Sequence, residues 1–203
     1  MKDEKILPIS QLKVPHTAMV MAAGFGTRLR PFTETVPKAL VPVLGVPMLD
    51  VVLNRLVAVG VKRAVINLHH LGDKIREHLQ GRQDIEIVYS VEEEILETGG
   101  GIVKALPLLG DEPFYAVNAK IIWLNGKTDA LIRLAQGWDD ARMDALLLLQ
   151  PTVSAVGYDG KGDFTMDQEG RVRRRLGWQV APFAMQAAQN LPSDWSEYFV
   201  SEI

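Results

Sequence analysis

Glycine, threonine, arginine and lysine residues are concentrated in the segment 24-GFGTRLRPFTETVPK-38, directly after a short apolar run. Glycines let main-chain N–H groups approach an anion closely, and Thr27 adds a hydroxyl donor. Arg28 provides a planar fork of donors for phosphate oxygens, and Lys38 provides a point charge. These residue types favour a phosphate-binding loop, although a plain turn between a strand and a helix would use the same glycines.

Two familiar phosphate motifs do not fit this segment. A dinucleotide fingerprint requires a third glycine where this chain has Leu29. A P-loop requires a lysine directly after its second glycine, whereas Lys38 follows a proline well beyond the glycines. An NAD-dependent oxidoreductase is therefore the least favoured function class.

The elements that must position this loop can be predicted from the apolar pattern. Residues 17–23 form a nearly all-apolar run, as expected of a strand buried on both faces. Further strands are predicted at 64–68, 85–90, 114–118 and 145–150, and helices at 48–59, 73–80, 98–109 and 129–136. This alternation predicts a three-layer α/β/α sandwich with a Rossmann-like, mostly parallel sheet. Because ligands bind beyond the carboxyl ends of such strands, the loop after Ala23 and the residues after Asn118 should share one edge.

Composition and charge argue against several classes of protein. A net charge of −3 and a pI near 5.8 provide no basic field for nucleic acid. The absence of cysteine excludes disulfides and thiolate zinc sites. The first residues contain no apolar signal region, and no apolar run reaches the length of a membrane span. We therefore expect a cytoplasmic protein with neither nucleic-acid nor membrane partners.

The segment 21-MAAGFGTRLRPFTETVPKALVPVLGVPML-49 resembles the signature of sugar nucleotidyltransferases. The resemblance continues through INLHHLGDKI, ILETGGGI, PFYAVN and GDFTMDQEGRV, and so covers roughly residues 18 to 183. The LETGGG form is most similar to bacterial N-acetylmuramate 1-phosphate uridylyltransferases and to mannose-1-phosphate guanylyltransferase-like proteins.

The resemblance implies one nucleotidyltransferase domain over residues 1–203, with a nucleotide-binding core at 17–150. A smaller antiparallel, sugar-side annex would occupy 151–203, and it looks short at its carboxyl end. The implied reaction joins a nucleoside triphosphate to a sugar 1-phosphate and releases pyrophosphate, with UTP and N-acetylmuramate 1-phosphate as the favoured pair. A mannose-1-phosphate guanylyltransferase and an inactive nucleotide-binding protein of the same fold are the alternatives. A monomer and a homodimer are both compatible with the sequence.

Site residues also follow from the resemblance. Arg28 and Lys38 would be catalytic, while Gly162 and Asp163 would approach the sugar phosphate. The residues implied in nucleotide binding are Ala22, Ala23, Gly24, Gly26, Thr27, Gly99, Gly100 and Asn118.

The family also implies Mg²⁺, and here the sequence departs from the pattern. Family members end the fourth strand with V-N-G-D, whose aspartate binds metal, whereas this chain has 117-VNAK-120. A protonated Lys120 cannot ligate Mg²⁺, and the family's second metal aspartate is not recognisable in 193-SDWSEYF-199. Three explanations stay open: a binder without catalysis, an ammonium group in place of metal charge, or an altered or incomplete sequence.

Three other polar groups are interpreted as structural. His69 and His70 are adjacent on an extended chain and lack a third ligand at suitable spacing. The acidic run 92-EEE-94 is typical of a solvated loop, and 171-RVRRR-175 of the wet face of a hairpin.

Overall fold

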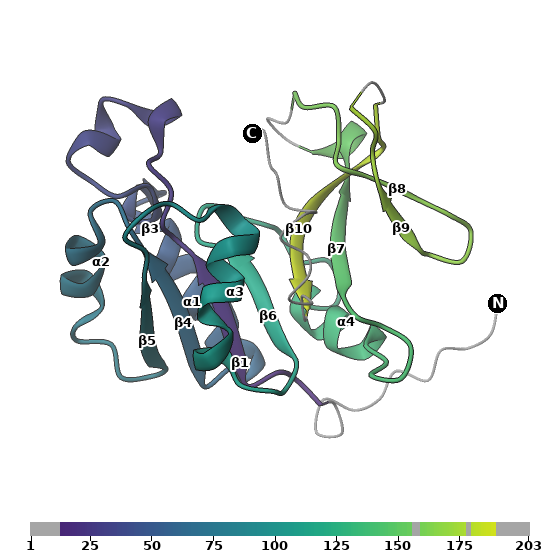
Figure 1. The fold of residues 1–203 in the computed structure, drawn as a ribbon, viewed down its shortest axis with the longest axis horizontal. Helices are drawn as coiled ribbons and strands as arrows, with labels where there is room; N and C mark the ends of the chain where they lie inside the picture. The colour runs from purple at the N-terminus through teal and green to yellow at the C-terminus, as the bar shows by residue number, and fades with distance from the viewer. Residues whose placement is uncertain (1–12, 156–158, 178–179, 190–203) are drawn as a thin grey trace.

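A computed structural model describes residues 13–155, 159–177 and 180–189, which form a twisted sheet with helices on both faces (Figure 1). The strand order is β5-β4-β1-β6-β10-β8-β9, and β7 pairs with β10 away from this path. The strands are β1 (Thr17–Met21), β4 (Arg63–Leu68), β5 (Glu86–Val91), β6 (Phe114–Asn118), β7 (Leu146–Pro151), β8 (Phe164–Met166), β9 (Val172–Arg174) and β10 (Phe183–Gln189). The predicted sandwich with a mostly parallel sheet is confirmed.

The helices occur where the apolar periodicity predicts them. They are α1 (Met48–Val59), α2 (Gly72–Leu79), α3 (Glu97–Leu109) and α4 (Ala130–Gly137). Helix α1 ends at Gly60, which has a φ of 104° and donates from its N–H to the last carbonyl groups of the helix. Within the described part of the chain, no helix combines the length and apolar character needed to cross a membrane.

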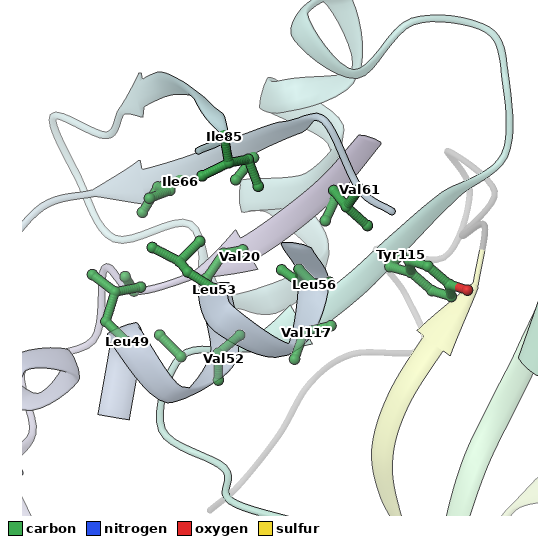
Figure 2. Close-up of a cluster of buried hydrophobic side chains, with 14 of the residues drawn as sticks. Val20, Leu49, Val52, Leu53, Leu56, Val61, Ile66, Ile85, Tyr115 and Val117 are labelled. Carbon is green, nitrogen blue, oxygen red and sulfur yellow. The ribbon is translucent and has the colours of Figure 1, made fainter. Parts of the chain in front are cut away.

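The core has two halves because neighbouring residues of β1 point to opposite faces of the sheet. Ala18 and Val20 pack on one face in a cluster built mainly by α1, α2 and α4, whereas Met19 packs on the other face against α3. Figure 2 shows the first cluster, in which side chains of α1 meet Val20 and Ile66 of the sheet. This burial on both faces explains why β1 is apolar at nearly every position.

The parallel register aligns three strand ends at one edge of the sheet. Strand β1 lies between β4 and β6, and Met21 is opposite both Asn67 and Asn118. The main-chain N–H of Ala119 also donates to the carbonyl oxygen of Met21 at 3.0 Å. The prediction that the loop after Ala23 and the residues after Asn118 share one edge is therefore confirmed.

Between β1 and α1 the chain does not turn directly into a helix. It forms the short 3₁₀ segments η2 (Thr27–Leu29), η3 (Phe32–Glu34) and η4 (Lys38–Leu40), then the two-stranded hairpin of β2 (Pro42–Val43) and β3 (Val46–Pro47). A further 3₁₀ turn, η5 (Thr152–Ser154), follows β7. The simple strand-to-helix turn considered from the sequence is thus replaced by a long structured loop.

Strand β10 is the main feature that the sequence pattern did not predict. It runs antiparallel to both β6 and β7 and lies between them, so that β6 and β7 are not neighbours. The predicted hairpin of the annex is confirmed as β8 and β9, which pair antiparallel and join the sheet through Phe164 and Phe183.

Candidate active site

A cleft of about 290 Å³ opens where β1, β4 and β6 end. Its floor comes from the strand ends and its sides from the long loop after β1, the start of α3 and the segment after β6. The lining residues are Met21, Ala22, Ala23, Gly24, Phe25, Gly26, Thr27, Arg28, Lys38, Ala39, Asn67, Glu92, Ile95, Glu97, Thr98, Asn118, Ala119 and Lys120.

The glycine loop is folded back tightly at Gly26. This residue has a φ of 65°, which favours glycine, and its carbonyl oxygen accepts from Thr33 Oγ1 at 2.8 Å. A Cβ at Gly26 would lie 2.9 Å from the Cβ of Lys38, so the loop and the lysine segment are in close contact. No main-chain N–H of residues 24–28 donates to another residue in the described part of the chain. These donors suit an anionic ligand.

Three cationic side chains, Arg28, Lys38 and Lys120, line the cleft. Burial and the neighbouring ammonium of Lys120, followed by the guanidinium of Arg28, lower the pKa of Lys38. Partial burial and Arg28 also lower the pKa of Lys120, against which Glu97 acts in the opposite direction. The mutual repulsion shows that the three cations share one electrostatic environment, and a polyanion bound there would relieve it.

A buried polar chain braces the floor of the cleft. The N–H of Ala22 donates to Asn67 Oδ1 at 2.6 Å, and Asn67 Nδ2 donates to Glu92 Oε1 at 2.8 Å. The other carboxylate oxygen of Glu92 accepts from the N–H of Leu96 at 3.1 Å. Asn67 and Glu92 are both only 3% exposed, so these hydrogen bonds satisfy groups that water does not reach. This series of hydrogen bonds links the end of β1 to the start of α3.

Helix α3 approaches these buried polar side chains closely at Gly101, which has no side chain of its own. A Cβ at Gly101 would lie 2.7 Å from Glu92 Oε1 and 3.0 Å from Asn67 Nδ2. The first residue of the helix, Glu97, adopts a φ of 56°, an unusual conformation for a residue with a side chain. Gly101, the last glycine of LETGGG, is therefore needed for the close contact with Asn67 and Glu92.

We expect Gly101→Ala to destabilise the protein, although alanine normally favours a helix over glycine by about 1 kcal/mol. The added methyl group would displace Glu92 and leave buried polar atoms of both Glu92 and Asn67 poorly paired. Each such group costs roughly 1–3 kcal/mol, so the sum exceeds the gain in helix propensity. Urea unfolding measures this change. The matched control is Gly81→Ala, because a Cβ at Gly81 meets no atom within 4 Å. A Gly101→Ala variant as stable as the parent would contradict the close-contact argument.

The two histidines support the loop after β1 from the side. His70 Nε2 donates to the carbonyl oxygen of Thr33 at 3.2 Å, and His69 Nδ1 lies 3.0 Å from the carbonyl oxygen of Glu92. The ring of Phe25 contacts both imidazoles, with ring centroids 5.3 Å and 5.5 Å away. Their observed contacts are thus structural, as interpreted from the sequence.

Most of the predicted site residues lie together. The lining includes Ala22, Ala23, Gly24, Gly26, Thr27, Arg28, Lys38 and Asn118. Gly99 and Gly100 stand in the first turn of α3, next to Thr98 of the lining. Gly162 and Asp163 are not among the lining residues; the carbonyl oxygen of Gly162 accepts from Arg175 Nε at 2.6 Å. Their sugar-side role stays a prediction.

Three residues were misassigned or overlooked from the sequence. Glu92 was interpreted as part of a solvated acidic run but is buried, because it accepts hydrogen bonds from Asn67 and Leu96. Arg175 was assigned to a wet hairpin face, yet it binds the loop at Gly162. Asn67 had a usable signal, since it is a polar residue inside the apolar run AVINL.

The cleft does not fit the divalent metal that the family signature implies. Among its described lining residues the carboxylates are Glu92 and Glu97, and both oxygens of Glu92 already accept hydrogen bonds. Lys120 occupies the position of the expected aspartate, and its charge repels a cation. In the ranges that the structure describes, no three acidic, histidine or cysteine side chains are grouped as a metal site.

Comparison with known proteins decides the family. The family model described as nucleotidyl transferase matches residues 17–174, which is more than half of the chain. The chain belongs to the nucleotidyl transferase family. The glycine loop, the cationic residues and the α3 entry all lie inside the matched region.

Curated relatives of this nucleotidyl transferase act on sugar phosphates by name. It is 42% identical over 175 residues to the N-acetylmuramate alpha-1-phosphate uridylyltransferase of Caulobacter vibrioides, covering 84% of this chain and 72% of that protein. The enzyme of the same name from Neisseria meningitidis is 44% identical, over 52% of this chain and 47% of its own length. A mannose-1-phosphate guanyltransferase of Hypocrea jecorina is 37% identical over 51% of this chain and 30% of its own length.

Solved structures confirm the fold. A UDP-glucose pyrophosphorylase in complex with UDP-glucose superposes with a TM-score of 0.70 at 15% identity, over 89% of this chain and 77% of that one. An inositol-1-phosphate CTP transferase from T. maritima gives a TM-score of 0.73 at 16% identity, over 93% of this chain and 76% of that one. At these identities the structures show the fold alone. The family model and the relative that is 42% identical show that the chain is an enzyme of the sugar-1-phosphate nucleotidyltransferase type.

Proposed function

We propose that this nucleotidyltransferase joins UTP to N-acetylmuramate 1-phosphate and releases pyrophosphate. The observation that carries the proposal is the cationic, glycine-lined cleft at the strand ends of a chain that is 42% identical to such a uridylyltransferase. The uridylyltransferase name of that relative favours UTP over GTP. A role in supplying cell-wall precursors would follow from the muramate sugar.

The reaction needs little covalent help from the protein. An oxygen of the sugar phosphate attacks the α-phosphorus of UTP and forms the new P–O bond. The bond from the α-phosphorus to the bridging oxygen of the β-phosphate breaks, and its electron pair leaves with pyrophosphate. Catalysis then depends on holding two anions in line and on stabilising the charge that develops on the leaving group.

The lining supplies those functions through a few groups. The main-chain N–H groups of residues 24–28 would hold phosphate oxygens, and Asn67 and Glu92 would keep the floor beneath them in place. Arg28 and Lys38 would neutralise the α-phosphate and the leaving pyrophosphate. An arginine so placed on a phosphoryl transition state can contribute roughly 10³ to 10⁵ in rate. Gly162 and Asp163 are proposed to approach the sugar phosphate from the annex.

A second candidate is a nucleotide-binding protein of the same fold without turnover. Lys120 favours it, because an ammonium group stands where the family signature has a carboxylate. Both candidates require nucleotide in the cleft, so nucleotide binding does not distinguish them. Release of pyrophosphate does, because only the enzyme turns its substrates over.

The test is pyrophosphate release over a grid of nucleoside triphosphates and sugar 1-phosphates, with Lys120→Asp assayed beside the parent chain. We expect the parent to turn over fastest with UTP and N-acetylmuramate 1-phosphate. GTP with mannose 1-phosphate is the informative competitor. Release with a different pair reassigns the substrates, and nucleotide binding without release from any pair supports the binding protein.

A further inference from the structure

We propose that the cluster of Arg28, Lys38 and Lys120 binds the polyphosphate of a nucleotide in its metal-free form. Free Mg²⁺ would then compete with the protein for the ligand instead of completing the site. The inference rests on the proposed nucleotide site. It adds that the site prefers the nucleotide without bound Mg²⁺. It comes from the disagreement between the family signature and the residues that this chain places in the cleft.

Lys120 is positioned by the sheet. It comes two residues after Asn118, the last residue of β6, and Asn118 pairs with Met21 at the end of β1. The hydrogen bond from Ala119 to Met21 continues this pairing past the end of the strand. Lys120 and the glycine loop therefore leave adjacent strands at the same edge, and both line the cleft.

The charges in the cleft are those of a polyanion site. Three cationic side chains line it against the carboxylates of Glu92 and Glu97, and Glu92 is directed into the buried hydrogen bonds with Asn67 and Leu96. Arg28 and Lys38 each interact electrostatically with Lys120. Without a ligand these like charges repel one another. A bound polyphosphate would convert that repulsion into attraction.

Mg²⁺ changes the ligand in a way that this cluster disfavours. The ion cancels two negative charges of the polyphosphate and brings bound water, so it weakens attraction to all three side chains. It would also stand close to the Lys120 ammonium, which repels it. Of the two described lining carboxylates, Glu92 is already engaged by Asn67 and Leu96, and Glu97 faces the charge of Lys120. A site built on an aspartate at this position would have the opposite preference.

The test is calorimetric titration of the protein with UTP, once with EDTA and once with excess Mg²⁺. We expect affinity in EDTA to exceed affinity in Mg²⁺ by roughly tenfold or more, equivalent to one charge-assisted hydrogen bond. Inorganic tripolyphosphate, titrated in the same way, should show the same order. This comparison uses the parent protein alone, so it does not depend on the folding of a variant.

Two substitutions assign the effect to Lys120. Lys120→Met should weaken binding in EDTA and reduce the difference between the two conditions, and Lys120→Asp should make Mg²⁺ strengthen binding. The matched control is Lys127→Met, which removes an exposed lysine of the same loop that does not line the cleft. We expect the control to titrate like the parent protein.

The outcomes separate this inference from the proposed function. UTP binding that requires Mg²⁺ in the parent protein would overturn the metal-free site but leave the nucleotidyltransferase intact. Titrations that Lys120→Met leaves unchanged would likewise overturn it. Absence of UTP binding in both conditions would overturn the nucleotide site itself, and the proposed function with it.

Discussion

Lys38→Ala is expected to weaken UTP binding by roughly 10- to 100-fold, the usual contribution of a hydrogen bond to a charged group. Lys38 is half-buried at the start of η4, where the contact with Gly26 holds it against the glycine loop. Turnover should fall further if the ammonium also stabilises the leaving pyrophosphate. Titration with UTP and steady-state pyrophosphate release measure the two effects.

The same variant should fold normally. Burial and the nearby cations lower the pKa of Lys38, so its charged form is disfavoured in the unliganded protein. Removing the ammonium therefore relieves repulsion, and the free energy of unfolding should stay constant or rise. Lys104→Ala is the matched control, since Lys104 is exposed on α3 and does not line the cleft. Equal losses of binding in both variants would refute a specific role for Lys38.

Much of the fold follows from the sequence because burial leaves a simple pattern. The all-apolar run of β1 and the helical spacing in α1 each match one surface of the core, as Ala18 and Met19 illustrate on opposite faces. Strand β10 leaves no such pattern. Its sequence FAMQAAQ is rich in alanine, a weak strand former, and it becomes a strand by pairing with β6 and β7 on either side.

The candidate site likewise has one part that can be predicted from the sequence and one part that cannot. The glycine loop with Arg28 and Lys38 is continuous enough in sequence to be predicted from residue types. Glu92 was not predicted, because its burial depends on Asn67, which is 25 residues earlier, and on the glycines of α3. A carboxylate in an acidic run resembles a solvated loop until the partner that buries it is known.

Lys120 shows that a chain can belong to a family and still lack one of the residues that the family's metal binding requires. The fold around it is intact, since Asn118 keeps its register with Met21 and Ala119 keeps its hydrogen bond. The departure from V-N-G-D therefore consists of Ala119 in place of the glycine and Lys120 in place of the aspartate, and of these two only Lys120 changes the charge presented to the ligand. This is why family membership follows from the whole chain, whereas metal dependence must be argued from the cleft alone.

Gly162→Ala is expected to cause the largest loss of stability among single substitutions in the annex. Gly162 has a φ of 75°, and an added Cβ would lie 2.0 Å from the carbonyl oxygen of Ala181, which is a main-chain atom that cannot rotate away. Ala181 is 1% exposed, and its N–H donates to the carbonyl oxygen of Lys161 at 2.7 Å. Relieving the clash would separate these segments, at a cost of roughly 3 kcal/mol or more.

Gly170→Ala provides the matched control for this prediction. Gly170 has a φ of 81°, close to that of Gly162, but a Cβ there meets no atom within 4 Å. It should therefore show only the backbone strain of a left-handed residue, roughly 1–2 kcal/mol. Urea unfolding of both variants separates strain from steric overlap, and equal losses would show that close packing at Ala181 adds nothing. If the annex holds the sugar phosphate, Gly162→Ala should also raise the KM for the sugar 1-phosphate more than Gly170→Ala does, because only the first displaces the loop that Arg175 binds.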